Sequence, residues 1–271
     1  MKHLLVPCDF KEESKTAIAM AGKLASKVGA SITLLHILYN EEGSAEAEEK
    51  IGELKAELAS LVNCPINTLV KAGDILEAIG ETAHEVQADL AVMITHGLQG
   101  SQQITGSLAL NVITQAELPF LVVQSKTGIG GEIQKVLVAL EYRQQSEEEL
   151  SKIIAFTKVL DAQVELFFHQ RPAEAKHSEL QSIVSQQFEE AGIAFTLEEN
   201  QKFDFSKAVV ERSKAIGAQL IIALNYSYEN LYSINPRTDE EDLIYNNAAI
   251  PILLITPQNQ DEDLEKPEDL L

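Results

Sequence analysis

Short apolar runs alternate with longer amphipathic segments along the first half of the chain. The apolar runs occupy residues 3–7, 31–38, 67–71, 90–94 and 120–123. In the segments 14–28, 45–61, 75–86 and 108–116, apolar residues recur at helical spacing. Strands that are apolar throughout are typical of a parallel sheet that is buried on both faces. The pattern therefore predicts an α/β fold in the order β-α-β-α-β-α-β-α-β.

The ends and faces of two predicted helices can also be placed from the sequence. Gly29 follows the segment 14–28, at the position where a left-handed C-cap favours glycine. The segment 45–61 is expected to bury one apolar face, formed by Ile51, Leu54, Leu58 and Leu61.

Three residues with binding potential follow or end predicted strands. Asp9 comes soon after the first strand, Ile37 ends the second, and Gly97 comes soon after the fourth. In an open parallel sheet, ligands bind beyond the carboxyl ends of the strands, where the strand order reverses. We therefore expect these three residues to lie at one ligand-binding edge.

The second half of the chain repeats the pattern of the first half. Lys135 aligns with His3 and Pro251 with Pro119 at an offset of 132, and Ala218 aligns with Ala88 at 130. A repeat of this length predicts two tandem copies of one fold. We expect domains at residues 1–127 and 132–257, a turn-rich linker within 125–131, and an acidic tail at 258–271 that forms a solvated, disordered end.

A glycine-containing loop distinguishes the first copy from the second. It runs from Gly97 to Gly106 and Ser107, and the predicted helix 108–116 follows. Glycines before a helix N-terminus offer unpaired N–H groups and a positive dipole end to an anion. The second copy has Tyr226 and Ser227 at the start of this loop and no glycine within 228–239. An anion site is therefore expected in the first copy alone.

Composition and charge narrow the class of protein. The chain has 271 residues, a formal net charge of -21 and a pI near 4.6, so nucleic acid and anionic membrane surfaces are not expected as partners. No apolar run approaches the roughly 18 residues that span a bilayer. Neither a signal peptide nor a disulfide framework is indicated, and we expect a cytoplasmic protein.

Several catalytic and metal-binding signatures are missing from the sequence. The six histidines form no HxH or HxxxH pair, and neither Cys8 nor Cys64 has ligand spacing. No GxSxG elbow and no GxxxxGK[ST] phosphate loop occur. We expect no metal site and no enzyme activity, and we expect Cys8 to be a buried, inert thiol rather than a redox sensor.

In combination, the local motifs resemble those of the universal stress protein family in its tandem two-domain form. The resemblance covers nearly the whole chain up to Pro257. It rests on Val6-Pro7-Cys8-Asp9-Phe10, Leu35-His36-Ile37, Gly73-Asp74, the run Ala88-Asp89-Leu90-Ala91-Val92-Met93 before Thr95-His96-Gly97, Gly106-Ser107, and Pro119 before Val122-Val123.

The resemblance implies two doubly wound domains, each with a five-stranded parallel sheet and helices on both faces. Members of the family often pair through the last strand, so we expect an intramolecular pseudo-dimer of the two domains, with a homodimer as a further option. Some members bind ATP and others do not. For this chain the implied ligand is ATP with Mg²⁺, in the first domain. The implied nucleotide contacts are Pro7, Asp9, Ile37, Met93, Gly97, Gly106, Ser107 and Leu108.

Two departures from the family's ATP motif concern the same loop. Ile94 stands where the motif has its first glycine, and eight residues rather than nine separate Gly97 from Gly106. Simpler interpretations of the site residues also stand: Asp9 caps a turn, Met93 belongs to the core, and the glycines close a loop. ATP binding by the first domain is therefore left open.

The predicted function is that of a non-enzymatic stress-response sensor or adaptor with an unidentified protein partner. One alternative is a purely structural or interaction module without a nucleotide. A second is a weak nucleotide hydrolase of the adenine-nucleotide α-hydrolase-like architecture. A third is a lipid-like or other small ligand in the second copy, beside Tyr226, Tyr228 and Tyr232.

Overall fold

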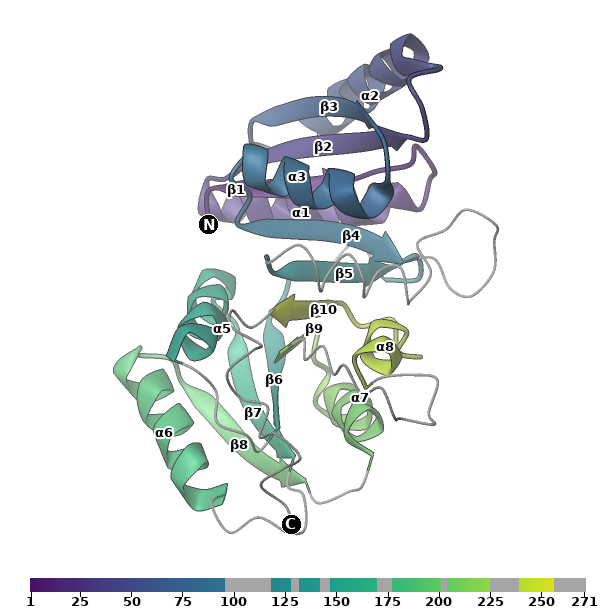
Figure 1. The fold of residues 1–271 in the computed structure, drawn as a ribbon. Coiled ribbons are helices and arrows are strands. Elements are labelled where there is room, and N and C mark those ends of the chain that lie inside the picture. Colours follow the sequence, from purple (N-terminus) through teal and green to yellow (C-terminus); the bar gives the residue numbers. More distant parts are fainter. Residues whose placement is uncertain are drawn as a thin grey trace, which may run out of the picture.

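The structure, a computed structural model, describes residues 1–95, 118–127, 132–141, 147–169, 177–200, 204–224 and 239–255. The strands within these ranges form one ten-stranded sheet in the order β3-β2-β1-β4-β5-β10-β9-β6-β7-β8. Figure 1 shows the strands of the first half followed by those of the second, with β5 and β10 at the junction. The predicted α/β class with a mostly parallel sheet is confirmed.

The first half contains five strands and three described helices. They are β1 (His3–Pro7), α1 (Ser14–Val28), β2 (Ser31–Leu38), α2 (Ser44–Ala59), β3 (Ile66–Ala72), α3 (Ile75–Glu85), β4 (Leu90–Thr95) and β5 (Phe120–Gln124). Gly29 adopts φ 69° at the C-cap of α1, as predicted. The predicted helix 108–116 lies outside the described residues.

One residue of a predicted helix face, Leu61, was assigned wrongly, whereas Ile51, Leu54 and Leu58 pack against the core. Helix α2 ends at Ala59 rather than Leu61, and the side chain of Leu61 is 72% exposed. The N–H groups of Leu61 and Val62 both bond to the carbonyl of Leu58, which closes the chain into a turn. Val62 packs against the core in place of Leu61 and contacts α1 at Gly22.

The second half has the same succession of elements in the described ranges, with one further helix, α8, between its last two strands. They are β6 (Lys135–Glu141), α5 (Glu147–Leu160), β7 (Gln163–His169), α6 (His177–Glu190), β8 (Phe195–Asn200), α7 (Phe205–Ile216), β9 (Leu220–Leu224), α8 (Asp239–Ile244) and β10 (Ile252–Ile255). Equivalent strand pairs in the two halves differ by the same offset as the aligned sequences. His3 pairs with Ser31 as Lys135 pairs with Gln163, which is 132 residues later in both cases.

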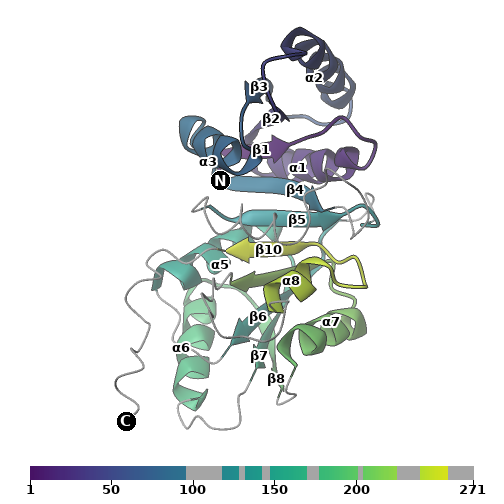
Figure 2. The ribbon, with the colours of Figure 1, turned by 45° about the vertical axis from the view of Figure 1, so that its right-hand side comes forward.

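Each half places its helices on both faces of the sheet. Helices α1, α2, α5 and α6 pack on one face and enclose one hydrophobic core. Helices α3, α7 and α8 pack on the other face over a second core. Figure 2 shows α1 and α3 on opposite sides of the first half, and α6 and α7 on opposite sides of the second.

The two halves join through their last strands. β5 and β10 pair antiparallel, with Leu121 opposite Leu253, Phe120 opposite Leu254 and Val122 opposite Ile252. Because equivalent residues differ by 132, this register is symmetric about the Leu121–Leu253 pair, like an isologous dimer interface within one chain. The central strands of the sheet are therefore buried at the junction.

Polar contacts also cross the junction. The amide of Gln124 donates to the carbonyls of Ile244 and Asn246, at 3.0 and 2.9 Å. The hydroxyl of Thr127 donates to the carbonyl of Ala249 at 2.9 Å. No helix among the described residues is long and apolar enough to cross a membrane.

Candidate functional site

The strand order β3-β2-β1-β4-β5 of the first half reverses direction at β1. The crevice between the carboxyl ends of β1 and β4 is therefore the expected ligand position of this topology. A cavity of about 90 Å³ lies at this place. Its walls come from the end of β1 and the residues after it, from β2, from the first half of α3 and from β4.

Asp9 is held in a hydrogen-bonded turn beside the cavity. Its carboxylate accepts from the hydroxyl of Ser14 at 2.5 Å and from the backbone N–H of Lys11 at 3.2 Å, and the Lys11 ammonium lies 3.1 Å from its second oxygen. Partial burial opposes ionisation, but these bonds outweigh it and lower the pKa of Asp9. The cavity therefore has a carboxylate at its rim at neutral pH.

His36 fixes the backbone that leaves β1. Its Nδ1 lies 2.8 Å from the carbonyl oxygen of Cys8, and because a carbonyl only accepts, Nδ1 carries the hydrogen. Phe10 adopts φ 60° and stacks on the His36 ring with centroids 4.0 Å apart. These contacts lock the turn that presents Asp9.

Cys8 lies beneath this turn and is 8% exposed. Burial, and after it the nearby Asp9 carboxylate, raise the pKa of the Cys8 thiol to about 12. The thiol is protonated at neutral pH, which agrees with the inert thiol that the sequence favours and leaves no activated nucleophile at this position.

Ile37 offers its backbone to the cavity. Residues of a strand direct their N–H and C=O groups alternately to the two neighbouring strands. The carbonyl of Leu35 accepts from Cys8 N–H at 2.8 Å, on the β1 side, whereas that of Leu38 accepts from Gly73 N–H on the β3 side. The N–H and C=O of Ile37 therefore face the β1 side, beyond Pro7, where β1 has ended. One donor and one acceptor lie there side by side.

The apolar walls come from α3 and β4. Ile75, Ile79 and Met93 belong to the core under α3, and they line the cavity. Ile94 points to the opposite face, is 6% exposed, and packs in the core under α1. Ile94, which replaces the glycine of the ATP motif, also lines the cavity.

Four of the eight sequence-predicted site residues lie around this one cavity: Pro7, Asp9, Ile37 and Met93. The other four, Gly97, Gly106, Ser107 and Leu108, lie outside the described residues. Sequence reasoning did not assign Ser14, Ile75 and Ile79 to the site. The signal for Ser14 was its place at the start of a helix shortly after Asp9, where a hydroxyl reaches back to the turn.

The equivalent place in the second half is filled with larger apolar side chains. Cys8, Leu35 and His36 correspond to Leu140, Phe167 and Phe168 at the offset of 132, and all three replacements are at most 3% exposed. Ile75 corresponds to Phe205 at the offset of 130, and it is 8% exposed. Among the described residues, the positions that line the cavity of the first copy thus carry larger, buried apolar side chains in the second.

No cluster of three or more metal-ligating side chains occurs in the part of the chain that the structure describes. Tyr226, Tyr228 and Tyr232, which were suggested as the wall of a second ligand site, fall outside that part.

Comparison with known proteins identifies the fold, and a family model matches the first half of the chain. The model of the universal stress protein family matches residues 1–124. A universal stress protein from Archaeoglobus fulgidus DSM 4304 has 17% identity and a TM-score of 0.71, and the match covers 94% of this chain and 98% of that one. No curated protein sequence matches the chain.

Two further solved structures share the arrangement along nearly the whole chain. One is a functionally unknown protein from Pseudomonas aeruginosa PAO1, with 13% identity, a TM-score of 0.64 and coverage of 95% of this chain and 93% of that one. The other is the cytoplasmic domain of a prokaryotic cation chloride cotransporter, with 13% identity, a TM-score of 0.55 and coverage of 93% and 94%. At these identities the likeness establishes the fold alone.

Proposed function

We propose, from the match of residues 1–124 to the universal stress protein family and the repeat of that fold in the second half, that the chain is a tandem member of this family. We propose further that its first half binds ATP with Mg²⁺ and its second half does not. The protein acts as a cytoplasmic, non-enzymatic sensor or adaptor in a stress response. Nucleotide binding in the first half alters the surface that is offered to a protein partner.

The observation that carries this proposal is the contrast between the two carboxyl edges. The first half keeps a cavity at its topological switch point, with Asp9 at the rim. The second half has Leu140 and Phe168 in place of Cys8 and His36. Since ligands of this fold class bind at the switch point, the open copy is the candidate for binding.

The groups around the cavity suit an adenine base. The N–H and C=O of Ile37 offer a donor beside an acceptor, which complements the ring nitrogen and amino group on the Watson–Crick edge of adenine. Met93, Ile75 and Ile79 supply the apolar contact that a purine ring requires. A cavity of about 90 Å³ accommodates part of a nucleotide, so the sugar and phosphates extend outward past Asp9.

Asp9 suits the ribose hydroxyls or the hydrated Mg²⁺ that accompanies the phosphates. Its lowered pKa keeps it an acceptor at physiological pH, and hard oxygen ligands are those that Mg²⁺ prefers. The phosphate contacts would come from the glycine loop. That loop lies outside the described residues, so its part in the proposal rests on the sequence.

The proposal of binding without turnover rests on the chemistry of the rim. Asp9 is held as a carboxylate by Ser14 and Lys11, and the Cys8 thiol stays protonated. Neither forms the nucleophile–base pair that group transfer requires. ATP would thus act as a regulatory ligand that is bound but not hydrolysed.

A thermal-unfolding assay with ATP and Mg²⁺ tests the proposal on the full chain. A ligand at a hundred times its dissociation constant stabilises the folded state by about 2.7 kcal/mol, which raises the melting temperature. The variant His36→Phe, which introduces the residue of the second copy, should lose this shift. The matched control, Phe168→Tyr in the second copy, should keep it.

Two outcomes would contradict the proposal. Absence of any shift at millimolar ATP would remove nucleotide binding and favour the purely structural module. Phosphate release well above the buffer rate, abolished in Asp9→Ala, would favour the hydrolase instead.

A further inference from the structure

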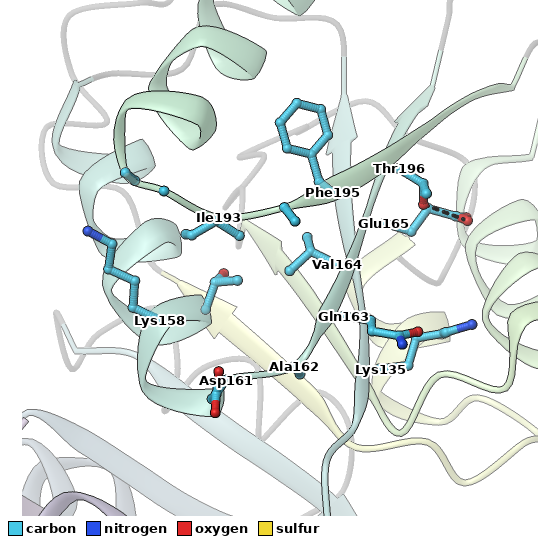
Figure 3. Close-up of a pocket in the computed structure, with 14 residues that line it drawn as sticks. Lys135, Lys158, Asp161, Ala162, Gln163, Val164, Glu165, Ile193, Phe195 and Thr196 are labelled. Atoms are coloured by element: carbon cyan, nitrogen blue, oxygen red, sulfur yellow. Dashed lines mark hydrogen bonds between the residues drawn. The ribbon is translucent and has the colours of Figure 1, made fainter.

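A larger hollow lies at the opposite edge of the sheet, in the second half. It has a volume of about 670 Å³ and is lined by the amino-terminal ends of β6, β7 and β8, by the C-terminal end of α5 and by the residues that join α6 to β8. Figure 3 shows Val164, Ile193 and Phe195 along one side, with Lys158 and Lys135 toward opposite ends. Its volume is in the range of pockets that bury a drug-sized ligand.

The first half has a larger side chain at the equivalent corner. Ile66 of β3 and Phe195 of β8 occupy equivalent positions in the sheet, because they pair with the equivalent residues Ile32 and Val164. The same offset of 129 aligns Val62 with Ala191. Val62 packs so closely over Gly22 that a Cβ there would lie 2.2 Å from its Cγ1. In the second half the smaller Ala191 stands at this position and lines the hollow.

The polar groups of the two corners differ in the same way. In the first half the His3 ring lies 2.6 Å from the Ser31 hydroxyl and 2.8 Å from the Thr33 hydroxyl, so these groups satisfy one another. Lys135 replaces His3 in the second half. Within the described part of the chain, the ammonium groups of Lys135 and Lys158 make no hydrogen bond and no ion pair.

The charge balance of the hollow is positive, although the protein as a whole carries a net charge of -21. Arg212, which lies outside the hollow, binds the Glu165 carboxylate through two bonds of 2.6 and 2.9 Å, and its Nη2 also lies 3.5 Å from Glu198. Apart from Glu165, the charged side chains that line the hollow are the two lysines and Asp161, two positive and one negative. An apolar wall with excess positive charge complements an organic anion.

We propose that this hollow binds a small organic anion with an apolar body, such as a carboxylate on an aliphatic or aromatic group. The apolar body lies against Val164, Ile193 and Phe195, and the anionic group lies toward Lys158 or Lys135. The site is independent of the nucleotide site, because it lies in the other copy and at the amino-terminal edge of the strands.

The test uses 1-anilinonaphthalene-8-sulfonate, a singly charged aromatic anion whose fluorescence rises in apolar surroundings. It is titrated into the full-length protein and into variants, and the binding position is mapped by backbone amide NMR shifts. We expect saturable binding with shifts concentrated at the end of α5 and the start of β8. Ala194→Phe, at an exposed position that lines the hollow, should weaken binding at least tenfold by filling it.

Charge variants identify the class of ligand. Lys158→Ala should weaken binding about two- to fivefold, the range for one exposed charge pair, and Asp161→Asn should strengthen it by a similar factor because a repulsion is removed. Lys207→Ala, which removes an exposed lysine of α7 outside the hollow, is the matched control and should leave binding unchanged.

Three results would overturn the proposal. One is the absence of saturable binding, and another is binding that Ala194→Phe and Lys158→Ala leave unchanged. The third is weaker binding by Asp161→Asn, since that would assign a cationic or zwitterionic ligand to the hollow. Competition by decanoate but not by decanol would confirm that the negative charge is recognised.

Discussion

The two halves of this protein share one sheet topology but carry different side chains at equivalent corners of the sheet. The first half has a cavity at the carboxyl ends of β1 and β4, and at its amino-terminal corner Val62 packs over Gly22 and the His3 ring lies against the Ser31 hydroxyl. The second half has a hollow at the amino-terminal corner, and the buried side chains Leu140, Phe167 and Phe168 stand at its carboxyl corner. The scaffold is the same in both halves, while the sizes and charges of a few side chains differ at these corners.

The difference teaches where a repeated α/β fold tolerates change. The symmetric β5–β10 junction needs apolar residues in both copies, because both strands are buried there. The corners of the sheet carry no such requirement. At one such corner the larger Val62 of the first half corresponds to Ala191 of the second half, which lines the hollow.

The largest expected effect on stability concerns the ion pair that the second half acquired. Arg212→Ala leaves the Glu165 carboxylate, which is 7% exposed, without its bidentate partner. Removing one partner of a buried pair costs about 3–5 kcal/mol, and since Arg212 is one-third exposed we expect about 2–3 kcal/mol. Urea unfolding followed by circular dichroism measures the loss.

The matched change in the first half is Thr82→Val, because Thr82 corresponds to Arg212 at the offset of 130. The Thr82 hydroxyl is buried and has no hydrogen-bond partner among the described residues. Removing an unsatisfied hydroxyl without changing the side-chain shape should leave the unfolding midpoint unchanged or raise it slightly. If Thr82→Val lowered the free energy of unfolding as much as Arg212→Ala does, the Thr82 hydroxyl would have to make a stabilising contact, which would contradict the structure.

The next effect concerns the closed corner of the first half. Gly22→Ala brings a Cβ within 2.2 Å of Val62 Cγ1, and such overpacking costs about 1–3 kcal/mol. The second half has Ile154 and Ala191 at the equivalent positions. Adding Val62→Ala should therefore restore part of the stability that Gly22→Ala removes, and a double-mutant cycle in urea measures this coupling. Additive losses would contradict the proposed exchange of large and small residues.

The smallest effect concerns the carboxylate at the end of β1. The pKa of Asp9 is lowered in the folded state, so its stabilising contribution is present above the unfolded-state pKa and is lost as the pH falls through the folded-state value. Asp9 is 40% exposed, so Asp9→Asn should cost less than about 1 kcal/mol at pH 7. The difference from the unaltered protein should shrink towards pH 3.

A control separates this effect from the loss of any negative charge. Glu53→Gln, at an exposed position of α2, should leave the unfolding midpoint within experimental error at both pH values. An Asp9→Asn loss that grows as the pH falls would contradict the assigned direction of the pKa shift.

Much of the fold could be predicted from the sequence, because apolar runs and helical spacing report burial directly. The bounds of β1 and β2 and the C-cap at Gly29 agree with the prediction to the residue. The exception at Leu61 shows the limit of periodicity. Spacing extends a helix as long as apolar residues recur, but the turn after Ala59 is set by backbone hydrogen bonds that the pattern does not contain.

The candidate site was less accessible to sequence reasoning. Motif residues such as Asp9 and Ile37 could be named, because they follow or end strands that share an edge. The hollow of the second half could not be found, since it depends on small residues such as Ala191 and on the packing of helix ends against the sheet. Its lysines resemble ordinary surface lysines until the structure brings them to one cavity.

The most direct test of the account is the stoichiometry of ATP and Mg²⁺ binding to the full chain, measured by isothermal titration calorimetry. The account predicts one site per chain, lost in His36→Phe and kept in Phe168→Tyr. Two equivalent sites per chain, or one site that survives His36→Phe, would contradict the claim that the open carboxyl corner of the first half is where the nucleotide binds.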